Sequence, residues 1–297
     1  MQAGASGWVL LTANSLPSLL LTPMSRPNSS ARKWLPRALE VPWVGKSARG
    51  ASDWIDLQWS LTVQSLRGVA PRARGRLLDV GCGSKPYEPI FRPYVAEYVG
   101  VEHESTFEVT AAEHSTNRPD VLYDGDRLPF ADDTFDTVLS VQVLEHTPHP
   151  AALVVEMGRV LKPDGILILT APFSFRLHEE PHDYFRYSPH GLRQLCTDAG
   201  LAVIEMQQQG SLWSLIGHKL NSYLGLEIAR IGGVAQSMGK LSHEAVQARP
   251  PRWWTLPWVV PTMGAISLGA RLLDSALPDR TEALGFLVIA EKPQRRG

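Results

Sequence analysis

The first residues arranged for chemistry follow an apolar stretch and read Asp79-Val80-Gly81-Cys82-Gly83. Because glycine has no side chain, a Gly-x-Gly turn lets the backbone approach a ligand closely. A dinucleotide site would place a third glycine three residues after the second to cradle a pyrophosphate, and Pro86 stands there. The carboxylate of Asp79 also disfavours a pyrophosphate at this turn. The loop therefore favours a cationic or zwitterionic ligand.

Other polar positions come where later apolar stretches, and hence strands, would end: Glu102, Asp124 with Gly125, and then Gln142 and His146 in the segment 141–146. The Glu102 carboxylate can accept hydrogen bonds from two ribose hydroxyls, a feature that dinucleotide enzymes share. Asp124 offers an acceptor to an adenine amino group. His146 can act as a base near neutral pH, or it can serve as a helix-entry residue that hydrogen-bonds the backbone.

Short apolar segments alternate with helical segments along the chain, and these elements must position the residues named above. We expect strands at 76–80, 97–101, 119–123, 135–141, 166–171, 201–207 and 284–290, and helices at 52–67, 87–95, 150–161 and 188–199, with a turn at 162–165. Continuous apolar strands are typical of a parallel sheet buried on both faces. The order predicts an α/β fold with a Rossmann-like, doubly wound, mostly parallel seven-stranded sheet and a helical insertion before the last strand.

In this order, the motifs resemble the class I S-adenosylmethionine-dependent methyltransferases, in the small-molecule, methyltransferase type 11-like branch. The resemblance covers residues 76–207 and the final strand. It implies that S-adenosylmethionine is the cofactor and that its site is formed by Asp79, Gly81, Cys82, Gly83, Glu102, Asp124, Gly125 and Gln142. Within this set Asp79 and the glycines would shape the methionine pocket, Glu102 would hold the ribose, and Asp124 with the Gly125 backbone would meet the adenine. Cys82 is expected to pack rather than to react, and Ser84-Lys85-Pro86 departs from the family's usual residues after the second glycine.

A second motif, residues 171–188, is dense in titratable and aromatic groups. It resembles a segment of methyltransferases encoded among glycan and cell-envelope genes, and it favours a substrate loop. The predicted catalytic residues are His146, His182 and Asp183, with His178 a further candidate base. The alternative for His182 and Asp183 is loop anchoring. Two cysteines make neither a disulfide framework nor a metal knuckle, and we predict no metal site.

Charge and composition give the remaining organisation. The formal net charge of −1 predicts no nucleic-acid partner. Residues 1–50 contain one acid, Glu40, and are expected to be a poorly ordered extension in which Met24 is an alternative start. We divide the rest into a methyltransferase core (51–210), a helical insertion (211–278), and the last strand with a tail (279–297).

The insertion contains an uncharged stretch, 253–270, bracketed by Arg252 and Arg271. Eighteen residues is the lower limit for spanning a bilayer, and the tryptophans with flanking arginines favour a membrane-interface segment. A lid packed on the core or on a second subunit explains the same pattern. We expect a cytoplasmic protein, with peripheral contact at the inner face of a membrane through 211–278.

These observations predict a methyltransferase that transfers a methyl group in line to a small-molecule, lipid-linked or glycan-linked acceptor. Two alternatives remain open. One is a non-catalytic S-adenosylmethionine-binding or membrane-associated interaction protein. The other is an NAD-dependent oxidoreductase, which Pro86 and the acidic loop after the third strand disfavour.

Overall fold

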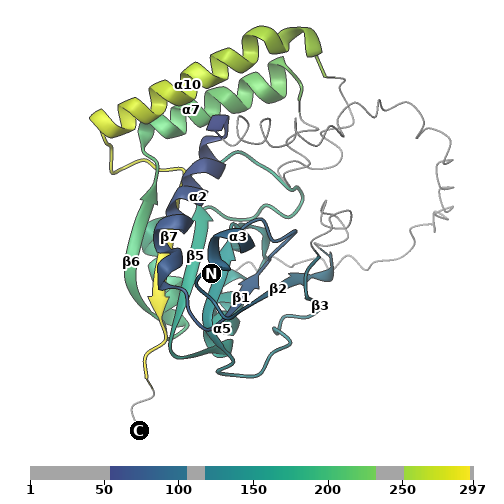
Figure 1. Cartoon of the computed structure of the whole chain (residues 1–297), viewed down its shortest axis with the longest axis vertical. Helices are drawn as coiled ribbons and strands as arrows, with labels where there is room; N and C mark the ends of the chain where they lie inside the picture. The colour runs from purple at the N-terminus through teal and green to yellow at the C-terminus, as the bar shows by residue number, and fades with distance from the viewer. Residues whose placement is uncertain (1–53, 106–117, 232–250, 295–297) are drawn as a thin grey trace, which may run out of the picture. The chain divides into compact units, whose positions relative to one another are not determined.

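The computed structural model describes residues 54–105, 118–231 and 251–294. The expected extension 1–50 and Met24 lie outside these ranges. Seven strands form one sheet in the order β3-β2-β1-β4-β5-β7-β6 (Figure 1). The pairs among β1 to β5 are parallel, and β7 is antiparallel to both β5 and β6. The predicted mostly parallel, seven-stranded α/β sheet is confirmed.

The strand bounds lie close to those expected: β1 Arg76–Val80, β2 Glu97–His103, β3 Val121–Tyr123, β4 Phe135–Val141, β5 Leu161–Pro172, β6 Ala202–Gln209 and β7 Gly285–Glu291. The expected turn at 162–165 lies inside β5 instead of before it. The register of β5 against β4 jumps between Leu161 and Ile166, and Asp164 has a φ of 61°. The turn residues therefore form a bulge within one long strand.

The described helices of the core are α2 Leu57–Val69, η2 Ala70–Arg72, α3 Glu88–Phe91, η4 Leu144–His146, α5 Pro150–Val160 and α6 Pro189–Asp198. α2 begins at residue 57 because the Asp56 side chain accepts a hydrogen bond from the Trp59 amide (3.1 Å). α3 is much shorter than the predicted helix 87–95. Pro93 has no amide hydrogen to donate to residue 89, so the helix cannot continue.

Successive strand residues point to opposite faces of the sheet, and each face has its own core. Leu78 packs in a cluster with Met157 of α5 and Leu192 of α6. Leu77 packs in a second cluster with Leu66 of α2 and Phe91 of α3. Helices therefore cover both faces, and this arrangement brings the carboxyl ends of β1 to β4 to one edge, where α/β folds bind ligands.

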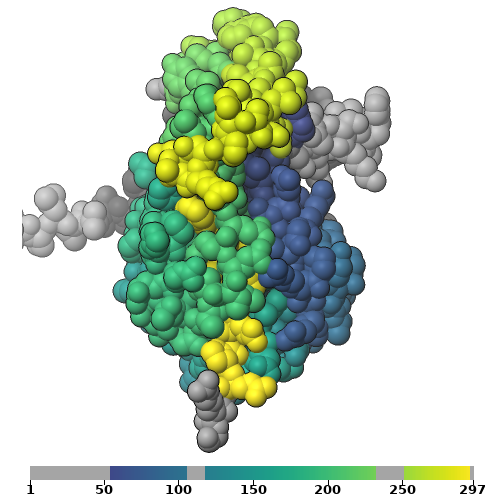
Figure 2. Space-filling model, turned by 90° about the vertical axis from the view of Figure 1, so that its left-hand side faces the viewer, coloured from purple at the N-terminus to yellow at the C-terminus, as the bar shows by residue number. Residues whose placement is uncertain are grey.

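The described part of the insertion contains α7 Leu212–Tyr223, η5 Leu224–Ile228, η6 Trp253–Thr255 and α10 Leu256–Ala276. α7 and α10 run side by side above the sheet (Figures 1 and 2). Asn221 of α7 donates to Ser267 of α10 (2.8 Å) and to the Ile55 carbonyl (3.2 Å). Arg271 donates to Ser60 of α2 (2.6 Å). The predicted insertion before the last strand is thus helical and rests on the start of α2.

Candidate active site

The turn after β1 is shaped by its backbone. Gly81 has a φ of 73°, and a Cβ at this position would lie 2.4 Å from Cγ2 of Val143. Its amide donates to the Val101 carbonyl of β2 (2.9 Å). Gly83 also has a positive φ, 50°, but a Cβ there would meet no atom of the described residues within 4 Å. Gly81 is therefore required by the fold, while Gly83 borders open space that a ligand can fill.

Two buried carboxylates flank this turn. The Tyr98 hydroxyl donates to Asp79 Oδ2 (2.5 Å), and burial raises the pKa of Asp79 to about 7. Glu102 accepts from the Gly83 amide at Oε2 and from the His103 amide at Oε1, both at 2.9 Å. Burial also raises the pKa of Glu102. Because each Glu102 oxygen keeps a second lone pair, this side chain can still accept ribose hydroxyls.

The departure at Ser84-Lys85-Pro86 has a structural explanation. Lys85 is buried with a φ of 56°, and its ammonium group pairs with Asp120 at 2.6 Å. A Cβ at Gly100 would lie 2.7 Å from both Cys82 Sγ and Lys85 Cε, so these side chains fill the base of the loop. Burial raises the pKa of the Cys82 thiol, which fits the expected packing role. Lys85 and Asp120 were missed, because their pairing depends on the unusual backbone of Lys85.

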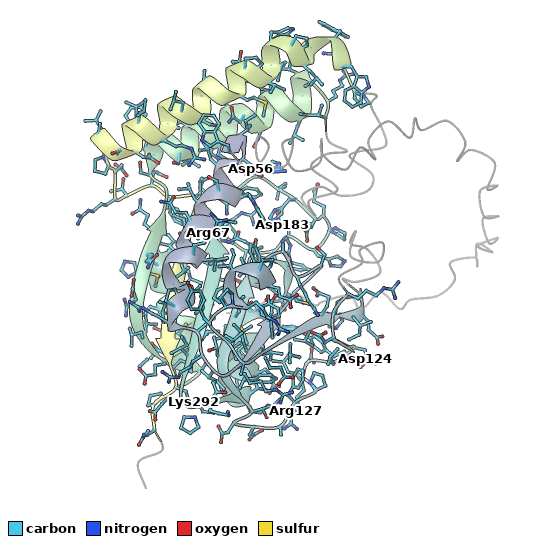
Figure 3. The ribbon with its side chains drawn as sticks, viewed as in Figure 1. Asp56, Arg67, Asp124, Arg127, Asp183 and Lys292 are labelled. Atoms are coloured by element: carbon cyan, nitrogen blue, oxygen red, sulfur yellow. The ribbon has the colours of Figure 1, made fainter. Side chains whose placement is uncertain are left out.

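Asp124 and Gly125 follow β3 at the same sheet edge and are exposed. Figure 3 shows Asp124 beside β3, apart from Asp183. Gln142 follows β4 with a φ of 56° and donates to Thr170 Oγ1 of β5 (3.1 Å). Its Oε1 accepts from Gln58 of α2 (3.3 Å). Gln58 was missed, because the sequence does not show which face of α2 covers the site.

The loop between β5 and α6, residues 173–188, is fastened onto η4. The His146 imidazole lies with Nδ1 2.8 Å from the His182 carbonyl. The Tyr184 amide donates to the Glu145 carbonyl (2.8 Å), and the Tyr187 hydroxyl donates to the Leu144 carbonyl (2.9 Å). The loop therefore packs against η4, which begins two residues after Gln142 in the chain.

The structure gives Asp183 and His182 anchoring contacts. Asp183 pairs with both terminal nitrogens of Arg186 (2.6 and 2.8 Å) and accepts from the His178 amide (2.9 Å). Burial opposes ionisation of Asp183, but the Arg186 hydrogen bonds prevail and lower its pKa to about 2. The His182 ring is exposed and contacts Tyr184 Oη (3.1 Å), not Asp183. Of the two readings from sequence, loop anchoring fits these contacts better than catalysis.

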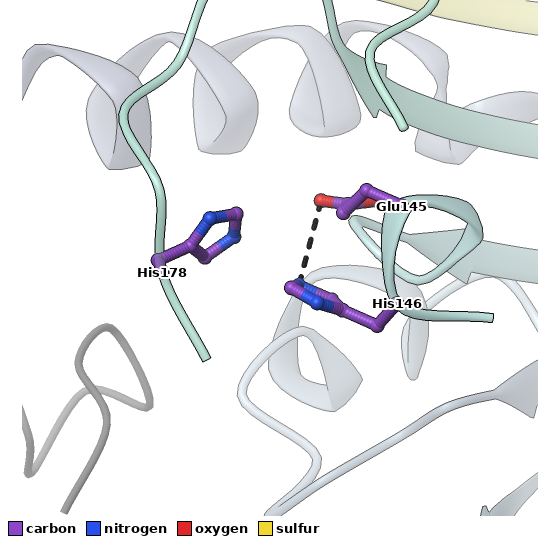
Figure 4. A group of neighbouring side chains, drawn as sticks. All are labelled: Glu145, His146 and His178. Atoms are coloured by element: carbon purple, nitrogen blue, oxygen red, sulfur yellow. Dashed lines mark ion pairs between the residues drawn. The ribbon is translucent and has the colours of Figure 1, made fainter. Parts of the chain in front are cut away.

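His146 instead meets His178 and Glu145 (Figure 4). The two imidazole rings are 4.6 Å apart in an edge-to-face arrangement. Burial lowers the pKa of His146, lowers that of His178 to about 4, and raises that of Glu145 to about 8. The imidazoles are therefore neutral near pH 7. Glu145 was not singled out from the sequence, although Gln142 and His146 on either side of it were.

Comparison with known proteins shows what the central part of the chain is similar to. The family profile described as "Methyltransferase domain" matches residues 78–169, the segment from β1 to β5. An uncharacterised methyltransferase of Mycobacterium leprae is 33% identical over 165 residues, 52% of this chain and 61% of the relative. One of Mycobacterium tuberculosis is 41% identical over 96 residues, 32% of this chain and 38% of the relative. These matches thus span less than two thirds of each relative's length.

Solved structures of similar fold include the complex of the Haloferax volcanii Trm112 methyltransferase activator with a putative methyltransferase. That match has a TM-score of 0.49 and 19% identity, and covers 86% of this chain and 97% of the other. A putative methyltransferase of Bacillus halodurans matches with a TM-score of 0.44 and 16% identity over 78% and 99% of the two chains. Residues 78–169 thus match a methyltransferase domain, which agrees with the methyltransferase resemblance of this segment.

Proposed function

We propose that the chain is an S-adenosylmethionine-dependent methyltransferase whose cofactor lies over the turn Gly81 to Gly83. One observation carries the proposal. Within a methyltransferase domain, the Gly83 turn leaves open space for a ligand while its amide is held by the buried carboxylate of Glu102. Asp79 would face the methionine part, and Asp124 with Gly125 would meet the adenine at the exposed end of β3.

In such a site the methyl carbon leaves the sulfonium sulfur as it bonds to the acceptor atom, and the C–S electron pair remains on sulfur. Positioning of the two reactants supplies much of the rate enhancement. η4, which carries His146, and the loop 173–188 are the elements placed to hold the acceptor. We assign His182 and Asp183 to holding this loop in place.

We propose further that the acceptor is small, lipid-linked or glycan-linked, and that α7 and α10 bring the site to a membrane surface. Trp253, Trp254 and Trp258 are 60%, 73% and 48% exposed. The helical stretch from residue 253 to 276 is long and apolar enough to cross a membrane by length and composition alone, and only 22% of its apolar window is buried. Phe175 of the substrate loop stacks on His218 of α7 (4.9 Å between centroids), so the loop and the insertion are in contact.

Transfer of a labelled methyl group from S-adenosylmethionine tests the catalytic claim. The purified chain, incubated with membrane and soluble extracts, should label a product in one of them. The non-catalytic alternative predicts cofactor binding with no labelled product in either. The oxidoreductase alternative predicts binding of a nicotinamide dinucleotide, which the proposal excludes.

A flotation assay with anionic liposomes tests the membrane claim. The chain should float with the liposomes. A protein that stays at the bottom of the gradient, and that elutes as a dimer, would support the lid or subunit interface instead.

A further inference from the structure

We propose that Glu145, His146 and His178 bind a divalent transition-metal ion beside the cofactor turn. One ligand atom from each residue lies within 4.8 Å of the other two, and the three side chains converge from η4 and the substrate loop (Figure 4). No metal was expected from the sequence, because these residues are not spaced as a recognisable ligand motif.

The Glu145 carboxylate is the first feature that indicates a bound cation. Its side chain has no exposed surface, and neither carboxylate oxygen accepts a hydrogen bond from another described residue. The neutral imidazole of His146 has its Nε2 3.8 Å from Oε1, which is too far for a hydrogen bond. Burying a carboxylate without a partner is costly, so a buried glutamate aimed at two imidazoles indicates a ligand between them.

The orientation of the two histidine rings also indicates metal ligands. His146 Nδ1 lies 2.8 Å from the His182 carbonyl oxygen, and His178 Nδ1 lies 3.2 Å from that of Arg176. Since a carbonyl oxygen can only accept, each Nδ1 carries the proton and each Nε2 keeps a lone pair. An imidazole that donates its other nitrogen to a carbonyl is the usual arrangement around a bound metal.

The charged groups around Glu145, His146 and His178 also favour a cation. Glu179 Oε2 lies 3.6 Å from His146 Nε2, so a second carboxylate faces the same lone pair. The nearby cation Arg186 is engaged by Asp183. Among the described residues, several acceptors thus converge without a donor between them. A cation would satisfy them together.

The donor set indicates which ions fit. Two imidazole nitrogens and a carboxylate oxygen suit Zn²⁺ or another borderline divalent ion, whereas Mg²⁺ prefers oxygen ligands and water. Ligand bonds of about 2.1 Å would place tetrahedral ligand atoms about 3.4 Å apart, so small side-chain rotations would close the site. Three protein ligands leave a coordination position open, and we assign it to a heteroatom of the methyl acceptor. That last assignment rests on the proposed function.

Calorimetry with Zn²⁺ on the tag-free, chelator-treated full chain tests the site. We expect one equivalent to bind with a Kd of about 1 μM or tighter, since imidazole and carboxylate are good zinc ligands. Glu145→Gln keeps the shape of the side chain and should weaken binding by at least about 100-fold, as loss of a direct ligand exceeds a second-shell change. His178→Asn should do the same. His190→Asn, on an exposed helix position, is the matched control and should bind as the wild type does.

Thermal unfolding keeps the test valid if a variant folds poorly. Zn²⁺ should raise the Tm of the wild type and of H190N but not that of E145Q. Substoichiometric Zn²⁺ binding to the wild type, or binding by E145Q equal to that of the wild type, would overturn the proposal. S-adenosylhomocysteine binding to the metal-free protein is measured in parallel. If S-adenosylhomocysteine binds and Zn²⁺ does not, only the metal-site proposal fails. If Zn²⁺ binds and S-adenosylhomocysteine does not, only the proposed function fails.

Discussion

The turn after β1 and the loop after β5 meet at one edge of the sheet but are built differently. The first is shaped by backbone: Gly81 has a positive φ and no room for a Cβ, and Glu102 is held by backbone amides. The second is shaped by side chains. Asp183 and Arg186 form an ion pair within residues 173–188, and the Tyr187 hydroxyl bonds this loop to η4. A cofactor common to a family suits the first construction, and a chain-specific acceptor suits the second. Variants of the two loops should therefore fail in different ways.

The largest effect is expected at Gly81. Gly81→Ala places a Cβ 2.4 Å from Val143 at a φ of 73°, so strain and overpacking together should destabilise the fold by about 2–4 kcal/mol. S-adenosylhomocysteine binding should be lost as well. The matched control is Gly269→Ala in α10, where a Cβ meets nothing within 4 Å and the change should stabilise by about 0.5–1 kcal/mol. Chemical denaturation and calorimetry measure both, and a G81A variant that binds like the wild type contradicts this description of the turn.

The next effect tests the other loop. Asp183→Asn leaves the Arg186 guanidinium with a neutral partner. The free energy of local unfolding of residues 173–188 should therefore fall by about 2–3 kcal/mol, at or below the lower end of the cost of breaking a buried pair. Hydrogen exchange in this segment should accelerate, and methyl transfer should fall. Affinity for S-adenosylhomocysteine should stay within about twofold, because the cofactor turn is untouched.

Asp198→Asn is the control for that variant, since Asp198 is exposed and contacts Gln194 on the same helix. It should change neither exchange nor activity. Equal loss of cofactor affinity and activity in D183N would show that the two loops are not separable.

A smaller effect depends on pH and concerns Asp79. Its pKa in the folded protein is about 7, against a reference of 3.8, so the folded state holds this proton more tightly than the unfolded state. The resulting stabilisation is complete below pH 4 and is lost as the pH rises through 7. Asp79→Asn cannot ionise. The free energy of unfolding of the wild type, minus that of D79N, should therefore fall by about 2 kcal/mol between pH 5 and pH 8.

Denaturation of the cofactor-free proteins at a series of pH values measures this difference. Tyr98→Phe removes the hydroxyl that stabilises the Asp79 carboxylate. It should therefore increase the fall in the free energy of unfolding as the pH rises. A difference that does not change with pH would show that Asp79 is ionised throughout.

The smallest effect on stability is expected at Trp254, which is 73% exposed. Trp254→Ala should change the free energy of unfolding by less than about 0.5 kcal/mol while reducing flotation with anionic liposomes. Leu177→Ala, 66% exposed on the substrate loop, is the control and should float as the wild type does. Unchanged flotation of W254A would favour a protein partner for this surface.

The two loops also differ in how far the sequence predicts them. Apolar strands that end in glycine or an acid predict the sheet and the cofactor turn, because those signals are local in the chain. The contacts between Gln58 and Gln142, and between Lys85 and Asp120, join residues 84 and 35 positions apart. Such pairs depend on helix orientation and on unusual backbone angles. Glu145 lies between Gln142 and His146, which the sequence did single out. Its burial without a hydrogen-bond partner among the described residues depends on the packing of η4 and the loop 173–188, which the sequence does not show.

Calorimetric titration of the purified chain with S-adenosylhomocysteine, and separately with NAD⁺, tests the central claim most directly. We predict one equivalent of S-adenosylhomocysteine bound by the wild type, clear weakening in Glu102→Gln, and no heat of binding with NAD⁺. Failure of S-adenosylhomocysteine to bind a folded wild-type protein, or preferential binding of NAD⁺, would contradict the account.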